Sequence, residues 1–123
     1  MAHAHCVLLV EDNVESAEAF EAILNVSGAA VVCAPHGRRA LEILSHEGDF
    51  CLILLDLMMP VMDGYAFRDV QRADPQLSTI PVVVLSGVYE YAAVQLGLNV
   101  FLRKPFLPME LIAAVDRHCA ANR

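Results

Sequence analysis

The sequence has little positive charge and no long apolar run. Only 8 residues are Lys or Arg, whereas 15 are Asp or Glu, and the formal net charge is −7. Nucleic-acid binding needs clustered Lys and Arg to displace counterions, so we expect no direct contact with nucleic acid. The apolar runs stay well short of the roughly 20 residues of a membrane span. Because the first residues also lack a signal-peptide pattern, we expect a cytoplasmic protein that does not contact a membrane.

Paired cysteine motifs are missing as well. The four cysteines, at positions 6, 33, 51 and 119, include no CxxC pair. Cys6, Cys33 and Cys51 lie in or beside short apolar runs. This pattern favours reduced, buried thiols that pack as small hydrophobic side chains.

No internal repeat, low-complexity tract or linker divides the chain. Its 123 residues, 57% of them apolar, are enough for one domain with a buried core. We therefore predict a single domain over residues 1–123, with its core at about residues 6–120.

Short apolar runs alternate with amphipathic segments along the whole chain. The apolar runs predict strands at residues 6–10, 30–34, 51–55, 82–85 and 100–102. Helical spacing of apolar residues predicts helices at residues 14–26, 37–45, 64–72, 89–96 and 109–121. Strands that are apolar throughout and alternate with helices predict a parallel sheet covered on both faces. The expected fold class is α/β: a doubly wound, flavodoxin-like (βα)₅ fold with a five-stranded parallel sheet.

Polar side chains stand where four of the predicted strands end. Glu11 and Asp12 follow the first strand, Asp56 ends the third, Ser86 ends the fourth, and Lys104 follows the fifth. Doubly wound sheets carry their sites at the carboxyl ends of the strands. We therefore expect these five side chains to converge at one edge of the sheet.

The three acidic residues of this group suit a magnesium ion. Taken separately, Glu11 and Asp12 would read as an acidic pair at a helix N-terminus, and Asp56 as a solvated carboxylate at a strand end. Three carboxylates brought together repel one another, and a divalent cation removes that conflict. Magnesium prefers oxygen ligands and is usually held by one or two carboxylates together with phosphate oxygens.

The remaining two residues suit a phosphoryl group on Asp56. Lys104 supplies a positive charge and Ser86 a hydroxyl donor. Phosphoryl transfer asks a protein mainly for positioning and charge neutralisation. A carboxylate nucleophile that forms an aspartyl-phosphate is a known covalent route. Asp56 is therefore the candidate phosphoacceptor.

With these residues in place, the chain resembles the receiver domains of two-component response regulators over about residues 6–120. The matching motifs are the Glu11-Asp12 pair, the stretch 56–64 (DLMMPVMDG), the Ser86-Gly87 strand end and the stretch 101–106 (FLRKPF). The resemblance implies a phosphoprotein of a two-component system or phosphorelay. A sensor histidine kinase or a histidine phosphotransfer protein would donate its phosphohistidine phosphoryl group to Asp56.

The resemblance also implies roles for individual residues. Magnesium would be held by Glu11, Asp12, Asp56 and the backbone carbonyl of Met58. Ser86 would be the switch hydroxyl, Phe101 the aromatic switch residue, and Lys104 would pair with the phosphoryl group. The domain would not be an enzyme in the usual sense, since it catalyses only its own phosphoryl transfer and dephosphorylation. Its output would be contact with a protein target that the sequence does not name, with a homodimer as one option.

The sequence departs from the family pattern in two respects, and a third feature bears on the lifetime of the phosphoryl group. The spacing from Ser86 to Gly97 is about four residues shorter than usual, which is roughly one helical turn. We expect the helix at residues 89–96, or the loop before it, to be shortened, and this puts ordinary dimerisation and switching in doubt. Phe101 lacks the hydroxyl of the tyrosine often found there. Apolar Met58 and Val88 flank the site, so we expect slow self-dephosphorylation.

Three other functions compete with this interpretation. A receiver-like interaction domain that works without phosphorylation is the main alternative, and the shortened helix favours it. A phosphatase of the haloacid dehalogenase type would need a second aspartate where this chain has Met58. A flavin-binding protein would need a Ser/Thr/Gly-rich loop after the first strand, where this chain has Glu11-Asp12-Asn13. The start at Met1 favours a stand-alone regulator or an N-terminal receiver, although a receiver cut from a hybrid kinase stays open.

Overall fold

The computed structural model describes residues 6–46, 50–56, 64–86, 101–103 and 106–121 and has an α/β fold. Its strands are β1 (Cys6–Val10), β2 (Ala30–Ala34), β3 (Leu52–Asp56), β4 (Val82–Ser86) and β5 (Phe101–Arg103). Its helices are α1 (Val14–Val26), α2 (Gly37–His46), α3 (Gly64–Ala73) and α5 (Pro108–Ala121), with a 3₁₀ turn η1 (Leu77–Thr79). The predicted α/β class with a parallel sheet is confirmed. The helix predicted at residues 89–96 lies outside the described residues.

The strands are arranged in the order β2-β1-β3-β4-β5, and each neighbouring pair is parallel. The strand order reverses beside β1, which lies between β2 and β3. Val10 pairs with Leu55, and Asp56 pairs with Leu85, so β1, β3 and β4 end at the same edge of the sheet. Open α/β sheets bind ligands outside the carboxyl ends of their strands at such a reversal.

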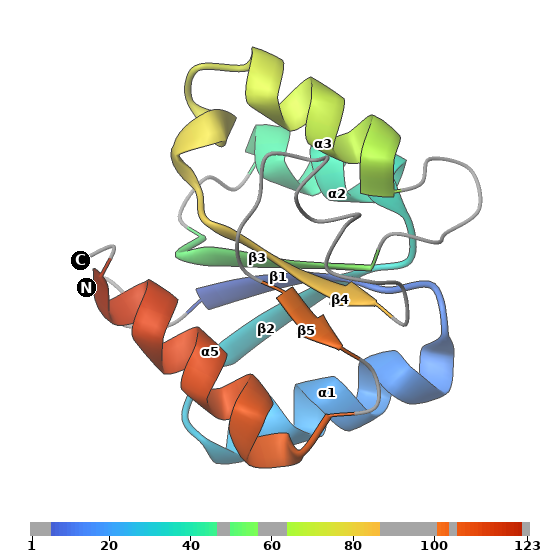
Figure 1. The fold of residues 1–123 in the computed structure, drawn as a ribbon. Helices are drawn as coiled ribbons and strands as arrows, with labels where there is room; N and C mark the ends of the chain where they lie inside the picture. The colour runs from blue at the N-terminus through green and yellow to red at the C-terminus, as the bar shows by residue number, and fades with distance from the viewer. Residues whose placement is uncertain (1–5, 47–49, 57–63, 87–100, 104–105, 122–123) are drawn as a thin grey trace.

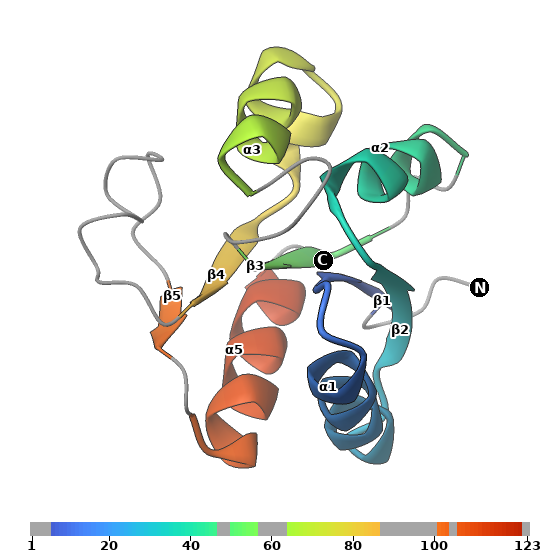
Figure 2. The same ribbon diagram turned by 90° about the vertical axis from the view of Figure 1, so that its right-hand side faces the viewer.

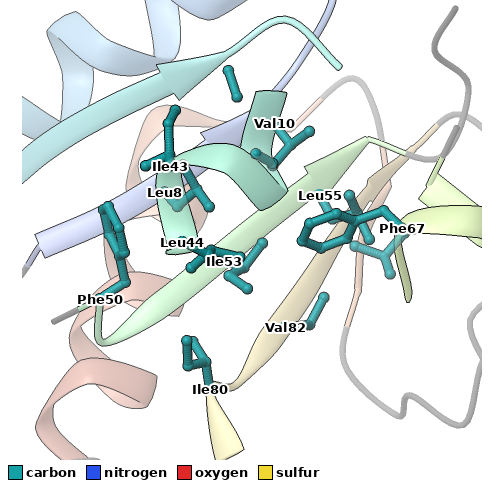
Figure 3. Packing of buried hydrophobic residues seen from close by; sticks show 13 residues of the cluster. Leu8, Val10, Ile43, Leu44, Phe50, Ile53, Leu55, Phe67, Ile80 and Val82 are labelled. Carbon is teal, nitrogen blue, oxygen red and sulfur yellow. The ribbon is translucent and has the colours of Figure 1, made fainter. Parts of the chain in front are cut away.

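Helices cover both faces of the sheet (Figures 1 and 2), with α2 and α3 on one face and α1 and α5 on the other. Side chains alternate along each strand, so neighbouring residues of β1 and β3 enter opposite cores. Figure 3 shows one core, in which β1 and β3 contribute Leu8, Val10, Ile53 and Leu55. The other core contains Val7, Leu9, Leu52, Leu54, Leu111 and Val115. Burial on both faces explains why these strands are apolar throughout.

The ends of α1 follow from two residues beside it. The side chain of Asn13 accepts a hydrogen bond from the Ser16 backbone N–H at 2.8 Å, so Asn13 is the N-cap. Gly28 has φ of 99°, a left-handed conformation that favours glycine and ends the helix. The cap matters for the site because it fixes the turn that joins the acidic pair to α1.

The prediction of reduced, buried thiols was wrong about the oxidation state of Cys51 and about the burial of Cys33, whose thiol is free. Cys51 and Cys119 form a disulfide with 5.0 Å between their Cα atoms. Cys33 is exposed rather than buried, because β2 is an outer strand of the sheet. Cys6 is partly buried and takes no part in a disulfide. The bonded pair is separated by 68 positions, and it meets where the end of α5 packs against the start of β3.

None of the helices in the described part of the chain combines the length and apolar character needed to cross a bilayer.

Candidate functional site

Three carboxylates meet at the carboxyl edge of the sheet. Glu11, Asp12 and Asp56 each offer one oxygen atom, and these atoms all lie within 4.8 Å of one another. Glu11 is 3% exposed and Asp56 is 7% exposed, whereas Asp12 is exposed to solvent. The cluster therefore has a buried side formed by two carboxylates and an open side at Asp12. Within the described part of the chain, no other group of three His, Cys, Asp or Glu side chains comes close enough to hold an ion.

Glu11 is positioned by the backbone on both sides of it. Its N–H donates to the Ala34 carbonyl at 3.0 Å, which extends the ladder between β1 and β2 by one residue. Its Oε2 accepts a hydrogen bond from the Asn13 backbone N–H at 3.2 Å. The residue that caps α1 thus also holds the Glu11 carboxylate, so the turn before α1 orders part of the acidic cluster.

Asp56 is positioned by the centre of the sheet. It is the last residue of β3, and Leu52 to Leu55 before it are 0% exposed. Its pairing with Leu85 of β4 fixes the position of Asp56 along the strand direction, and so the level of the sheet edge from which its carboxylate projects. A carboxylate buried to this degree is unfavourable unless it is hydrogen-bonded, paired or bound to a metal ion. The position of Asp56 is therefore set by the fold and not by a mobile loop.

The donor set fits a small, hard divalent cation. Three carboxylate oxygens close together repel one another, and a cation bound among them replaces repulsion by attraction. Magnesium takes oxygen ligands, needs octahedral coordination and keeps several waters, so a few protein oxygens on one side are sufficient. The exposed side at Asp12 leaves room for water or for oxygens of a substrate. No sulfur or nitrogen donor takes part in the cluster, which argues against a structural zinc site.

The other predicted site residues are placed only in part. Ser86 is the last residue of β4, one position after Leu85, the partner of Asp56. Phe101 is the first residue of β5 and pairs with Val84. Met58 and Lys104 lie outside the described residues, and so does Val88. Their predicted roles therefore remain predictions.

Known proteins resemble this chain over nearly its full length. The sequence model of the response regulator receiver domain matches residues 7–116. Response regulator Rre1 of Synechocystis sp. is 37% identical over 123 residues, which cover 94% of this chain and 52% of that protein. The chain spans about half the length of most of the curated relatives that it matches.

Solved structures agree with the sequence match. The signal receiver domain of a signal transduction histidine kinase from Syntrophus aciditrophicus has a TM-score of 0.88 and 31% identity, covering 95% of this chain and 91% of that one. The receiver domain of sensor histidine kinase PA1611 from Pseudomonas aeruginosa PAO1 has a TM-score of 0.85 and 29% identity, covering 94% and 98%. The latter structure has a magnesium ion coordinated in its active site cleft.

Proposed function

Because this chain belongs to the response regulator receiver domain family, we propose that it is a phosphoaccepting receiver in which Asp56 takes a phosphoryl group with the help of Mg²⁺. The observation that carries the proposal is the convergence of Glu11, Asp12 and Asp56, whose carboxylate oxygens lie within 4.8 Å of one another. The magnesium ion in the receiver domain of PA1611 supports the same assignment.

The proposed reaction transfers a phosphoryl group from a histidine nitrogen to a carboxylate oxygen of Asp56. A carboxylate oxygen of Asp56 attacks the phosphorus of a phosphohistidine, the P–N bond breaks, and its electron pair stays on the imidazole, which takes up a proton. The product is an aspartyl-phosphate, as in other carboxylate nucleophiles. A magnesium ion held by Glu11, Asp12 and Asp56 would neutralise the charge on the carboxylates and the phosphoryl oxygens. The protein itself holds the acceptor in place through β3 and its pairing with β4.

Several finer assignments belong to this proposal. The fold would be the complete doubly wound (βα)₅ arrangement, with its fourth helix at residues 89–96. The carbonyl of Met58 would complete the metal site, Lys104 would pair with the phosphoryl group, and Ser86 and Phe101 would relay the change. The domain would act on no separate substrate and would work in the cytoplasm. A sensor histidine kinase or histidine phosphotransfer protein would be its donor, and a protein would be its target.

The direct test is phosphoryl labelling of the full chain. The protein is incubated with Mg²⁺ and acetyl phosphate, and in parallel with phosphoramidate, and its intact mass is recorded. We expect one added phosphoryl group, lost in Asp56→Asn and lost when Mg²⁺ is chelated. Asp69→Asn is the matched control, since Asp69 is an exposed aspartate on α3, outside the acidic cluster, and it should label normally.

The test also separates the two candidate functions. Absence of labelling by either donor, in protein that is folded and binds Mg²⁺, would contradict a phosphoaccepting role. It would favour the interaction domain that works without phosphorylation. Labelling that survives in Asp56→Asn would place the acceptor elsewhere and overturn the assignment of Asp56.

A further inference from the structure

A covalent tie joins the last turn of α5 to the beginning of β3. Cys119 is 0% exposed and is bonded to Cys51, which directly precedes β3 and is partly exposed. Figure 1 shows the C-terminal end of α5 on the side of the sheet where β1 and β3 begin. The disulfide therefore lies at the edge opposite to the acidic cluster.

The two halves of α5 are anchored by different means. Near its start, Phe106 stacks on Phe20 of α1 with 5.2 Å between ring centroids, and Leu111 and Val115 are almost completely buried. In the stretch from 116 to 119, Asp116 and Arg117 are exposed and Cys119 is the one buried side chain. Apolar packing holds the first half of the helix, and the disulfide holds its last turn.

We propose that the Cys51–Cys119 disulfide is a redox-sensitive latch that fixes the end of α5 when closed and releases it when reduced. Cellular thiols keep most cytoplasmic cysteines reduced, and disulfides that do form there are usually transient and either catalytic or redox-sensing. The latch rests on the cytoplasmic setting proposed above but needs no phosphorylation.

Opening proceeds by thiol–disulfide exchange with a low-molecular-weight thiol such as glutathione. An incoming thiolate attacks the sulfur of Cys51, the more exposed partner, and the S–S bond breaks with its electron pair on the sulfur of Cys119, which takes up a proton. A second thiol then attacks the mixed disulfide and releases the Cys51 thiol together with a small-molecule disulfide. Two electrons and two protons pass to the protein, and two small thiols are oxidised.

The exposed Cys33 is a poorer redox partner than this pair. Although Cys33 is exposed as a residue, partial desolvation of its sulfur, the nearby charge of Glu21 and a hydrogen bond that the thiol donates to it raise the pKa of the Cys33 thiol to about 11. Since the thiolate is the reactive form, Cys33 is a slow nucleophile at neutral pH. Cys33 can therefore be replaced in the test without removing the proposed latch.

Opening the latch should leave the acidic cluster unchanged. From Cys51 to Asp56 the chain advances five residues along β3, about 17 Å at the usual rise of a strand. The intervening residues, Leu52 to Leu55, are fully buried and hydrogen-bonded to β1 and β4. The surface formed by the end of α5 therefore responds to redox state while the carboxyl edge of the sheet does not.

The test uses the full-length Cys6→Ser/Cys33→Ser variant, in which the latch cysteines are the two that remain. The protein is equilibrated at a series of ratios of reduced to oxidised glutathione, quenched with acid and alkylated under denaturing conditions. Intact mass should change from no adduct to two adducts as the buffer becomes more reducing. Amide hydrogen exchange in residues 116–119 should accelerate by about tenfold or more on opening, with β1 and β3 unchanged.

Three results would overturn the latch. Two adducts in fully oxidising buffer would mean that the bond does not form, and no adduct in the most reducing buffer would mean a permanent structural bond. Equal exchange of residues 116–119 in both states would mean that opening releases nothing. Phosphoryl labelling of Asp56 is measured separately in both redox states, so failure of the latch and failure of the phosphoacceptor assignment are distinguishable.

Discussion

The two ends of β3 differ in what the chain places there. At its carboxyl end Asp56 is brought close to Glu11 and Asp12, an arrangement in which like charges oppose one another. At its amino end Cys51 is bonded to Cys119, an arrangement that restricts the unfolded chain. One edge therefore carries carboxylates that a bound cation would stabilise, and the other carries a bond that adds stability.

From this comparison we expect the proposed phosphoryl chemistry and the stability of the domain to depend on opposite edges of the sheet. A buried β3, hydrogen-bonded on both sides, lies between the two edges, so we expect little displacement to pass from one edge to the other. Changes at the amino edge should therefore alter unfolding without altering phosphoryl chemistry. Changes at the carboxyl edge should alter metal binding and labelling with smaller effects on unfolding.

Reduction of the disulfide should cause the largest loss of stability. A native disulfide contributes about 3 kcal/mol, chiefly by restricting the unfolded chain in the usual account, and the bonded residues are 68 positions apart. For a domain of this size we expect the melting temperature to fall by about 10 °C when dithiothreitol is added. Differential scanning calorimetry with and without the reductant measures the shift.

Cys51→Ser provides the control for this prediction. It should melt near the temperature of the reduced protein and should not respond to dithiothreitol. Magnesium binding should be the same in the oxidised, reduced and substituted forms. An affinity for Mg²⁺ that depends on redox state would show that the two ends of β3 are coupled.

Gln71 forms hydrogen bonds near the amino edge of the sheet. It is 0% exposed, and its Nε2 donates to the carbonyls of Leu77 at 2.8 Å and Ile80 at 3.1 Å, just before β4 begins. Gln71→Leu keeps the volume but leaves both carbonyls without this donor, which should cost about 2 kcal/mol. Urea unfolding at constant m-value measures the loss.

An exposed glutamine next to the same turn gives the matched comparison. Gln76→Leu changes the same residue type where its side chain is exposed and caps nothing, so its effect should stay within about 0.5 kcal/mol. If both substitutions had equal effects, the hydrogen bonds of Gln71 would not explain the stability of the turn.

Magnesium should stabilise the carboxyl edge. At a concentration ten times its dissociation constant, an ion that binds only the folded state adds about 1.4 kcal/mol, which raises the melting temperature by about 5 °C. Asp12→Asn should reduce the rise, because it removes one carboxylate from the cluster, yet it should leave the stability without Mg²⁺ almost unchanged since Asp12 is exposed. Asp69→Asn should keep the full rise. An equal rise in all three proteins would mean that Mg²⁺ acts elsewhere.

Local patterns in the sequence predicted the parts of this structure that local forces decide. The bounds of α1 agree with the prediction because Asn13 and Gly28 act on the residues next to them. The approach of Glu11, Asp12 and Asp56 was predictable because parallel strands that alternate with helices end at the same edge. The alternation of strands and helices was thus sufficient to predict that residues far apart in the sequence lie close together.

The cysteines show where this reasoning fails. Cys51 and Cys119 are 68 positions apart, and their pairing depends on where α5 packs against the sheet. Cys33 lies in an apolar run, and its exposure depends on β2 being an outer strand. Strand order and helix placement follow from the packing of the whole domain, so the spacing of these cysteines along the chain was not sufficient.

The smallest loss of stability predicted for the removal of a contact concerns the turn that joins the acidic cluster to α1. Asn13→Ala removes the side-chain oxygen that accepts from the Ser16 N–H and should cost about 1 kcal/mol. The backbone N–H that Asn13 donates to Glu11 is retained, so magnesium binding should hardly change. Asn13→Asp should restore the cap and add a negative charge beside Asp12, so it should recover stability while altering the affinity for Mg²⁺. Calorimetry of the unsubstituted protein and the two Asn13 variants measures their stability and their affinity for Mg²⁺. The contrary result would be that Asn13→Ala weakens Mg²⁺ binding as strongly as Asp12→Asn. The side-chain cap of Asn13 would then be needed to order the Glu11 carboxylate, and one turn would determine both stability and metal binding.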